Sequence, residues 1–424
     1  MLVYKFGGAS VKDADSVKNV SRILKRVVGQ QLVLVVSAMG KTTNALEKVM
    51  QEFWVGKSAE PFIAEIEKYH LDIIDGLFPA NGESIRKELK KITAALREKC
   101  SGSHSDNYHF EYDQIISLGE VIATKIIHAY LAASGLKASW IDARKIIRTT
   151  DRYREANVEW NKSTALVKRR IEKSTLDGNT VHITQGFIGH TREGFTTTLG
   201  REGSDFTAAI LGHILDAESV TIWKDVPGML NADPKYFDNT VLLEKISFKE
   251  AIELAYFGAS VIHPKTIQPL KQKGIPLFIK SFLDPDAMGS VIQESTAFDN
   301  HVPSFIFRMN QLLISLSPRD FSFVVEENLE DIFRYMSAQN VRINLMQNAA
   351  VSFSFCVDSD KIDLKKLIEH FKPDYEVRYN QNMELVTIRH YDDPTLERLL
   401  FQKKVFLEQK SRDTARLVIQ DKTT

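Results

Sequence analysis

The sequence has few cysteines and no excess of either charge. Only two cysteines, Cys100 and Cys356, occur among 424 residues, and neither has a partner at CxxC spacing. A disulfide framework is therefore not expected, and a reducing cytoplasmic location is favoured. Lys and Arg together number 55, as do Asp and Glu, so the basic surplus typical of nucleic-acid-binding proteins is missing.

Long apolar runs are missing as well. No apolar segment approaches the roughly 18 residues of a membrane-spanning helix. Lys5 and two glycines also interrupt the N-terminus where a secretion signal would carry its apolar core. Hydrophobic residues make up 43% of the chain, which suffices for ordinary cores. We therefore expect a soluble chain that binds neither nucleic acid nor membrane. It should fold into roughly three units of about 150 residues each, or into two with a large first one.

A glycine pair ends the first apolar run of the chain. The residues Val3 to Phe6 are typical of a buried strand that carries Lys5, and Gly7, Gly8, Ala9 and Ser10 follow before a helical pattern over 14–28. Glycines let an anion approach the backbone amides closely, and a helix N-terminus attracts negative charge. Taken alone, this stretch is equally compatible with a phosphate site and with a plain strand-to-helix turn.

The second apolar run, residues 31–36, is continuous and predicts a strand covered on both faces. It leads into Ser37 and Thr43, small hydroxyl residues at the end of a strand where open α/β sheets place ligands. Gly40-Lys41-Thr42 resembles the end of a P-loop. That motif needs a glycine five positions earlier, where Val35 stands, so the P-loop is excluded and Lys41 is expected to be solvated.

A predicted helix over 112–133 contains Gly119 and Glu120. Glycine inside a helix costs about 1 kcal/mol relative to alanine, so Gly119 is predicted to admit a ligand or another backbone. From this stretch alone, Glu120 is best interpreted as an ordinary surface carboxylate. His104 and His109 precede the helix without a carboxylate or cysteine at ligand spacing, and both are expected to be solvated.

A second glycine-rich segment, residues 185–205, brings Arg201, Ser204 and Asp205 to the start of a predicted helix over 206–214. Arginine offers a two-pronged donor to carboxylate or phosphate, whereas aspartate orients a lysine or holds Mg²⁺. A simple helix cap is the alternative for Asp205. Two turns within 224–235, after a strand at 219–223, are typical of a loop that covers a nucleotide.

The alternation of strands and helices predicts an α/β unit with an open, mostly parallel sheet and helices on both faces. Strands are also expected at 137–141, 146–149, 180–184 and 275–282. From about residue 303 the order βαββαβ over 312–378 predicts an α+β ferredoxin-like sandwich. A second, shortened copy is expected over 385–419, without a closing helix.

Five motifs stand in the order found in aspartokinases of the amino acid kinase superfamily, and the chain resembles them over essentially its whole length. The motifs are Lys5-Phe6-Gly7-Gly8-Ala9-Ser10, Gly119-Glu120, the segment 200–209, Asp225-Val226-Pro227-Gly228 and Phe257-Gly258-Ala259. The resemblance implies a kinase domain over 1–298 and tandem ACT domains over 299–424, which would form a homodimer. It further implies a monofunctional cytoplasmic enzyme at the first step towards lysine, threonine and methionine.

The implied reaction moves the γ-phosphoryl group of ATP, bound with Mg²⁺, to the side-chain carboxylate of L-aspartate. Such a nucleophile is already ionised at neutral pH and needs no general base. By resemblance, Lys5 neutralises the transferred group, and Asp205 organises Lys5 and the metal. The implied contacts of the amino acid are Ser37, Thr43, Glu120 to the ammonium, Arg201 to the α-carboxylate, and Ser204. Those of the nucleotide are Lys5, Gly7, Gly8, Ser10, Lys224, Asp225, Leu230, Lys235 and Ser260.

Some residues depart from the family pattern. Glu202 replaces a usual glycine, a change expected to affect only a loop surface. Lys224 stands where many members have threonine, and Ser260 stands where many have a basic residue, which suggests that a charge has moved. The stretch 344–350 offers no carboxylate to the ammonium groups of lysine. We therefore expect weak or absent inhibition by lysine.

Two other functions remain open at this point. The first is a sibling kinase acting on glutamate or acetylglutamate, which the ACT-like tail and the first motif disfavour. The second is a catalytically silent, amino-acid-sensing regulatory subunit. The presence of Lys5, Glu120, Arg201 and Asp205 together argues against a silent subunit.

Overall fold

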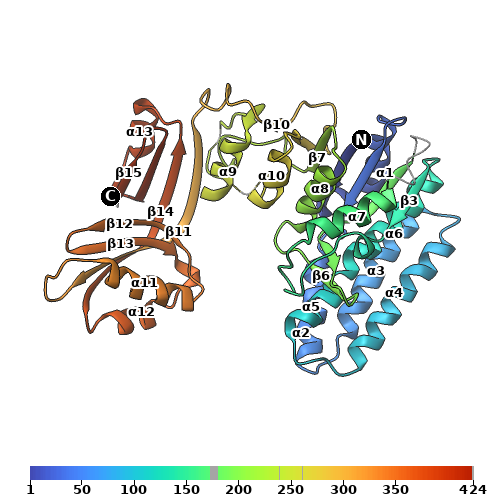
Figure 1. The fold of residues 1–424 in the computed structure, drawn as a ribbon, viewed down its shortest axis with the longest axis horizontal. Coiled ribbons are helices and arrows are strands. Elements are labelled where there is room, and N and C mark those ends of the chain that lie inside the picture. Colours follow the sequence, from blue (N-terminus) through green and yellow to red (C-terminus); the bar gives the residue numbers. More distant parts are fainter. Residues whose placement is uncertain (172–179, 238, 260, 423–424) are drawn as a thin grey trace. The chain divides into compact units, whose positions relative to one another are not determined.

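The computed structural model describes residues 1–171, 180–237, 239–259 and 261–422 (Figure 1). The chain divides into two compact units. The first contains Met1–Met229, Leu242–Ala255 and Ser260–Asp299. The second contains Leu230–Val241, Tyr256–Ala259 and Asn300–Thr424, so two short segments of the N-terminal part of the chain fold with the C-terminal part.

The first unit is built on an eight-stranded sheet with the order β3-β4-β2-β1-β7-β9-β10-β8. The strands from β3 to β9 in this order run parallel, whereas β10 is antiparallel to β9, as a mostly parallel sheet predicts. The strands are β1 (Leu2–Phe6), β2 (Leu32–Val36), β3 (Ala138–Ile141), β4 (Val181–Gln185), β7 (Ser219–Lys224), β8 (Lys245–Ser247), β9 (Leu277–Ser281) and β10 (Ser290–Gln293). A separate hairpin joins β5 (Ile188–His190) to β6 (Thr196–Thr198).

Helices cover both faces of this sheet (Figure 1). On one face lie α8 (Gly203–Ile214), α7 (Trp160–Ile171) and α10 (Pro264–Lys271). On the other lie α1 (Ala14–Lys25), α3 (Glu60–Leu77), α4 (Glu83–Ser101) and α6 (Leu118–Ala133). The remaining helical elements are η1 (Gly8–Val11), α2 (Thr42–Trp54), α5 (Tyr108–Ile116), η2 (Ala143–Lys145) and α9 (Phe248–Phe257).

The alternation of side chains along β1 places its lysine on the α8 face. Phe6 belongs to the core shared with α1, α3, α4 and α6, where it stacks on Trp223 of β7. Successive side chains of a strand point to opposite faces, so Lys5 points towards α8. Because β1 lies between β2 and β7, the lysine sits at the centre of the sheet.

Three features of this unit differ from the sequence expectations. Residues 146–149 form no strand, because Arg148 and Thr149 make only isolated bridges. The short strands β8 and β10 were not predicted. The stretch Tyr108–Ala133 is long and apolar enough to span a membrane by length and composition, contrary to expectation, but 67% of its most apolar window is buried inside the protein. It behaves as a core helix.

The second unit contains one antiparallel sheet with the order β12-β13-β11-β14-β16-β15. Its strands are β11 (Ser304–Pro318), β12 (Ile343–Ala349), β13 (Ser352–Asp358), β14 (Tyr375–Arg389), β15 (Lys403–Lys410) and β16 (Thr414–Asp421). Its helices are α11 (Glu326–Ala338), η4 (Ser359–Lys361), α12 (Leu364–Phe371) and α13 (Asp393–Leu400). The order of elements from the C-terminal half of β11 to the N-terminal half of β14 is βαββαβ, as predicted.

The strands β11 and β14 are longer than predicted and serve both halves of the sheet. The segments 375–378 and 385–389, predicted as separate strands, belong to the single strand β14, which pairs with β11 from end to end apart from register shifts near Gln311. Asn310 and Asn382 adopt positive φ angles of 53° and 56° in the middle of the two strands. The N-terminal half of β11 thereby gives the second copy a fourth strand.

The two halves of this sheet pack on each other. One apolar cluster takes residues from all six strands, namely Leu313, Leu345, Cys356, Met383, Leu385, Leu407 and Val418. Hydrogen bonds also connect strands that are distant in the sheet order. Gln409 Nε2 donates to Met346 O at 2.6 Å, and Arg416 Nη2 donates to Asn344 O at 2.5 Å. The sheet is therefore folded over, with β12 facing β15 and β16.

Candidate active site

Two lysines share one buried aspartate at the carboxyl end of the parallel strands. Lys5 Nζ lies 2.5 Å from Asp205 Oδ1, and their side chains are only 9% and 3% exposed. Lys224, the last residue of β7, places its Nζ 3.4 Å from Asp205 Oδ2 and also donates to Val261 O. Since Asp205 stands in the first turn of α8, the contact joins that helix to the two central strands.

The charges of this cluster do not cancel. Burial by itself would raise the pKa of Asp205, but Lys5 and Lys224 outweigh burial and hold the pKa below its usual value. One carboxylate therefore stays ionised between two ammonium groups, which leaves a net charge of about +1. An anion such as a phosphoryl group would complete the balance.

The geometry bears on one of the two roles that the resemblance gave Asp205. Each of its carboxylate oxygens lies against a lysine. Among the residues that the structure describes, no group of three or more His, Cys, Asp or Glu side chains has the arrangement of a metal site. The aspartate is thus placed to organise the lysines, and its role towards the metal stays a prediction.

The glycine turn after β1 packs tightly on the loop after β2. A Cβ atom at Gly8 would lie 2.8 Å from both Ala38 O and Gly40 O, so no larger residue fits. Ser10 Oγ donates to Trp223 O at 3.4 Å, which ties η1 to the end of β7. The turn is thereby fixed beside the lysine cluster.

Glu120 is buried, whereas its local sequence favoured an exposed surface carboxylate. The residue is 3% exposed, its Oε1 accepts a hydrogen bond from Ala38 N at 3.2 Å, and its Oε2 is buried without a partner. Burial raises its pKa to about 8, although the Ala38 amide and Lys5 act in the opposite direction. Gly119 lies close to side chains and not to the other backbone that was predicted, because a Cβ there would meet Ala38 Cβ at 2.9 Å.

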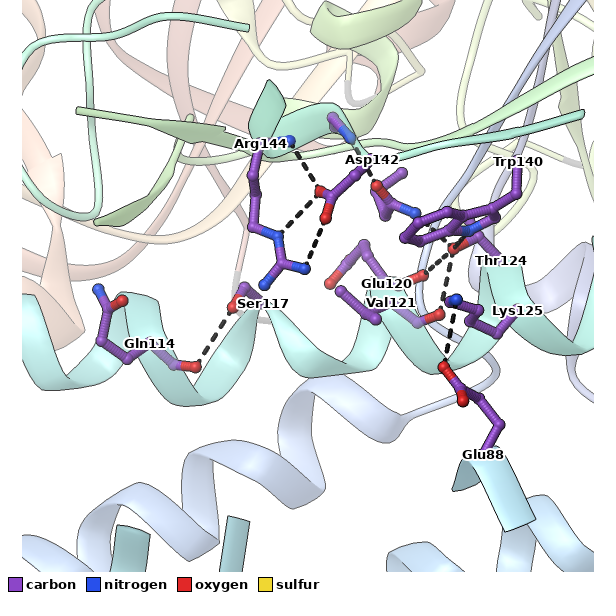
Figure 2. A network of polar contacts seen from close by, with 12 residues as sticks. Glu88, Gln114, Ser117, Glu120, Val121, Thr124, Lys125, Trp140, Asp142 and Arg144 are labelled. Carbon is purple, nitrogen blue, oxygen red and sulfur yellow. Dashed lines mark hydrogen bonds and ion pairs between the residues drawn. The ribbon is translucent and has the colours of Figure 1, made fainter. Parts of the chain in front are cut away.

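A polar network holds the helix that carries Glu120 (Figure 2). Thr124 Oγ1 accepts hydrogen bonds from Trp140 Nε1 at 3.1 Å and Gln185 Nε2 at 2.7 Å. The same hydroxyl lies 2.9 Å from Glu120 O within α6. Because Trp140 belongs to β3 and Gln185 to β4, the network fixes α6 against the sheet and sets the position of Glu120.

These side chains line one cavity of about 860 Å³. Eight of the predicted site residues belong to its lining, namely Lys5, Ser37, Thr43, Glu120, Arg201, Ser204, Asp205 and Lys224. Gly7, Gly8, Ser10 and Asp225 do not line it. Leu230 and Lys235 belong to the second unit, and Ser260 lies outside the described residues. The cavity therefore brings together the residues predicted for the amino acid and for phosphoryl transfer, but not those predicted for the rest of the nucleotide.

The lining also includes a loop that sequence reasoning missed, residues 152–155. Arg154 adopts a positive φ of 70°, and its backbone N donates to Asp113 Oδ2 at 3.0 Å. Thr198 N and Oγ1 bind the same carboxylate at 2.8 and 2.7 Å. Burial raises the pKa of Asp113 to about 6 despite these bonds. The Arg154 guanidinium lies 4.3 Å from the Tyr112 ring centroid, and Arg152 pairs with Glu155. The loop therefore brings both basic and acidic side chains to the lining.

Glu202 also lines the cavity, so the expectation of a mere loop-surface change is wrong. It precedes α8 with a φ of 53°, and its Oε2 is buried without a hydrogen-bond partner. Burial raises its pKa, and Lys224 is the leading opposing influence. Two departures from the family pattern, Glu202 and Lys224, thus carry opposite charges into one cavity. His109, expected to be solvated, lines it too.

Comparison with known proteins places this site in a family. Residues 1–281 match the amino acid kinase family. Lysine-sensitive aspartokinase 3 of Escherichia coli is 32% identical over 359 residues, which cover 85% of this chain and 78% of that protein. The chain belongs to the aspartokinases of the amino acid kinase family.

Solved aspartokinase structures share the fold of the whole chain. The crystal structure of E. coli aspartokinase III with lysine and aspartate superimposes with a TM-score of 0.82 at 26% identity, covering 100% of this chain and 96% of that one. The structure of the same E. coli enzyme with aspartate and ADP gives a TM-score of 0.79 at 26% identity, covering 99% and 96%. The aspartokinase fold therefore includes the antiparallel second unit.

Proposed function

We propose that this chain transfers the γ-phosphoryl group of ATP, bound with Mg²⁺, to the side-chain carboxylate of L-aspartate, which yields 4-phospho-L-aspartate and ADP. The observation that carries the proposal is the single cavity in which Lys5, Lys224 and Asp205 stand beside Glu120 and Arg201. The E. coli relative, solved with aspartate and ADP, supports both the acceptor and the nucleotide.

The amino acid half of the cavity offers one group for each charge of aspartate. Arg201 supplies a planar guanidinium suited to the α-carboxylate. Glu120 supplies a carboxyl group whose Oε2 has no partner within the protein, which suits the ammonium. Ser37, Thr43 and Ser204 add hydroxyl groups along the lining. The side-chain carboxylate of the substrate is left to face the lysines.

The phosphoryl half depends on placement of charge. Phosphoryl transfer requires alignment of the reactants and neutralisation of the oxygens more than covalent help. Lys5 and Lys224 are held on opposite oxygens of Asp205, so both ammonium groups are fixed before the substrate arrives. The acceptor carboxylate is ionised at neutral pH, and the site accordingly needs no general base.

Mg²⁺ is proposed to enter with the nucleotide, held chiefly by its phosphates, as is common for this ion. Gly7, Gly8 and Ser10 fit phosphate oxygens nearby, because the turn is tight, glycine-rich and fixed to β7 by the Ser10 hydroxyl. Asp225, Leu230, Lys235 and Ser260 stay predicted nucleotide neighbours.

We also infer a cytoplasmic homodimer that associates through the second unit. Phe321 and Phe323 are 84% and 70% exposed in the loop before α11. Exposed aromatic side chains favour association with a second copy. Sedimentation of the full chain should give twice the mass of one chain, and Phe321→Ser with Phe323→Ser should shift it towards the monomer.

The decisive experiment measures ADP release with aspartate, glutamate and acetylglutamate in parallel. Aspartate should support turnover at least about 100-fold above the other two acceptors in kcat/KM, since a site built for specific charged groups rejects analogues strongly. Lys5→Met should lower the rate of ADP release about 100-fold or more. Lys18→Met is the control and should leave the rate unchanged, because Lys18 is a surface lysine that pairs with Asp15. Equal or higher turnover with glutamate or acetylglutamate would reject aspartate as the substrate, and no turnover with any acceptor would indicate a silent subunit.

A further inference from the structure

Three arginines of the second unit surround one short segment, Tyr256–Gly258. Arg308 Nε donates to Phe257 O at 2.8 Å. The Arg416 guanidinium lies 5.0 Å from the Phe257 ring centroid, and the Arg342 guanidinium lies 5.0 Å from the Tyr256 ring centroid. None of the three forms an ion pair with a described residue. The lysine cluster of the first unit has Asp205 within ion-pair distance, whereas the one carboxylate that acts on this cluster, Asp358, does so at Arg308 from farther away.

The incomplete pairing of this charge has a cost. Burial lowers the pKa of Arg308 and of Arg416, and a neighbouring guanidinium group acts in the same direction on each, whereas Asp358 opposes the shift at Arg308 and Tyr256 opposes it at Arg416. In addition, Arg416 Nε is buried without a hydrogen-bond partner. A buried charged group with an unused donor is unfavourable unless something pairs with it. An anion beside Arg416 would relieve both the repulsion and the unused N–H group.

A cavity of about 730 Å³ lies beside these arginines, within the range of small-molecule sites. Arg342 and Arg416 line it, and no acidic residue does. The rest of its wall is mainly apolar, with Phe333 and Met336 of α11 and Leu345 of β12. The site thus offers two cations together with an apolar surface. The cations favour an anion, and the apolar wall disfavours a small hydrated one such as inorganic phosphate.

We propose that this cavity binds a small carboxylic or 2-oxo acid with a branched aliphatic body. The carboxylate meets Arg342 and Arg416, and the aliphatic body lies against Phe333, Met336 and Leu345. Because no acidic side chain lines the cavity, an α-ammonium group finds no counter-charge there. The acid is therefore preferred over the amino acid of the same skeleton, and lysine, with two ammonium groups, is excluded.

Isothermal titration of the full-length chain with 4-methylpentanoate tests this assignment directly. The acid is expected to bind at least about tenfold more tightly than 4-methylpentanamide, which lacks the charge, and than inorganic phosphate, which lacks the apolar body. L-leucine should also bind more weakly than 4-methyl-2-oxopentanoate. Arg342→Met and Arg416→Met should each weaken binding of 4-methylpentanoate about tenfold or more, the effect expected from loss of one charge-assisted hydrogen bond.

Arg334→Met is the matched control. Arg334 lies on α11 and is an exposed arginine that pairs with Glu330 and Asp331, so its loss should leave binding unchanged. Arg416 packs on Phe257 and its variant needs a thermal-unfolding check. Arg342 contacts Tyr256 at the exposed rim and keeps the test informative if the Arg416 variant is unstable.

Three results would overturn the proposal. The first is failure of 4-methylpentanoate to bind the folded chain. The second is equal binding by the amide or by phosphate. The third is wild-type affinity in both Arg342→Met and Arg416→Met. If a second copy of the chain covers the cavity instead, 4-methylpentanoate will not bind and Arg342→Met will change the sedimentation behaviour, which equally rejects the assignment. The readout does not depend on catalysis, so it stands apart from the proposed kinase function.

Discussion

Binding of aspartate at pH 7 should release nearly one proton from Glu120. Burial raises the pKa of this carboxyl group to about 8, so about nine tenths of the groups are protonated at pH 7 in the substrate-free chain. An ammonium group placed against Oε2 favours the ionised form and drives the proton off. The proposed role of Glu120 in holding the substrate therefore predicts a measurable proton count.

The same pKa fixes how affinity varies with pH. Ionisation of Glu120 costs about 1.4 kcal/mol for each pH unit below a pKa of about 8, which equals a tenfold change in affinity. The dissociation constant for aspartate should therefore rise about fivefold between pH 8 and pH 7, since about half of the Glu120 groups are already protonated at pH 8. It should rise about tenfold more towards pH 6 and level off above about pH 9, where Glu120 is ionised before the substrate binds.

Calorimetry without nucleotide measures both quantities. Titrations at pH 7 in two buffers of different ionisation enthalpy give the number of protons released, which should lie near 0.9 for a pKa of about 8. Glu120→Gln should release none and lose the pH dependence. Glu88→Gln is the matched control, because Glu88 pairs with Lys125 on the outer side of α6 and should behave as wild type. A proton count near zero in the wild-type chain would refute the assigned role of Glu120.

The remaining predictions concern catalysis and regulation. Lys5→Met should lower kcat about 100-fold or more with a small change in KM for aspartate, measured by ADP release, because its contact strengthens as charge develops. Arg201→Met should lower kcat/KM for aspartate roughly 30- to 150-fold with an unchanged unfolding curve. Glu202→Gly and Lys224→Thr should each raise KM for ATP. The effect of the double variant should be smaller than the sum of the two single effects, by about 1 kcal/mol of coupling energy. Strict additivity would show that the two residues act separately. Millimolar lysine should leave activity nearly unchanged, since the Asn344 amide already donates to Gln311 and Asp358; strong inhibition would contradict this.

The sheet and the reactive residues of the first unit could be predicted because they produce strong local patterns in the sequence. Continuous apolar runs indicate strands covered on both faces, and glycines at their ends indicate close approaches. Lys5, Arg201 and Asp205 occur in such segments, and parallel topology brings strand ends to one edge. The burial of Glu120 has no local signal, since it depends on Ala38, a residue 82 positions earlier.

Other parts of the site depend on contacts that no local pattern encodes. The loop at Arg154 is held by Asp113, 41 residues earlier, and its left-handed backbone is not readable from residue type. Glu202 adopts a positive φ angle, a conformation that favours glycine. Its burial beside Lys224 follows from the tertiary fold and has no signal in the local sequence. The strand predicted at 146–149 does not form, because the residues after its short apolar start make isolated bridges and no continuous ladder of hydrogen bonds.

The shared strands of the second unit have a consequence for its unfolding. β11 and β14 each run through both halves of the sheet, where β11 pairs with β13 and β14, and β14 pairs with β11 and β16. One apolar cluster takes side chains from all six strands. Neither half of the sheet contains a complete set of backbone hydrogen bonds by itself, so neither is expected to stay folded without the other. Limited proteolysis at Asn382, midway along β14, should therefore release no stable fragment. Cleavage there should instead cause this part of the chain to unfold as a whole, in a single cooperative transition.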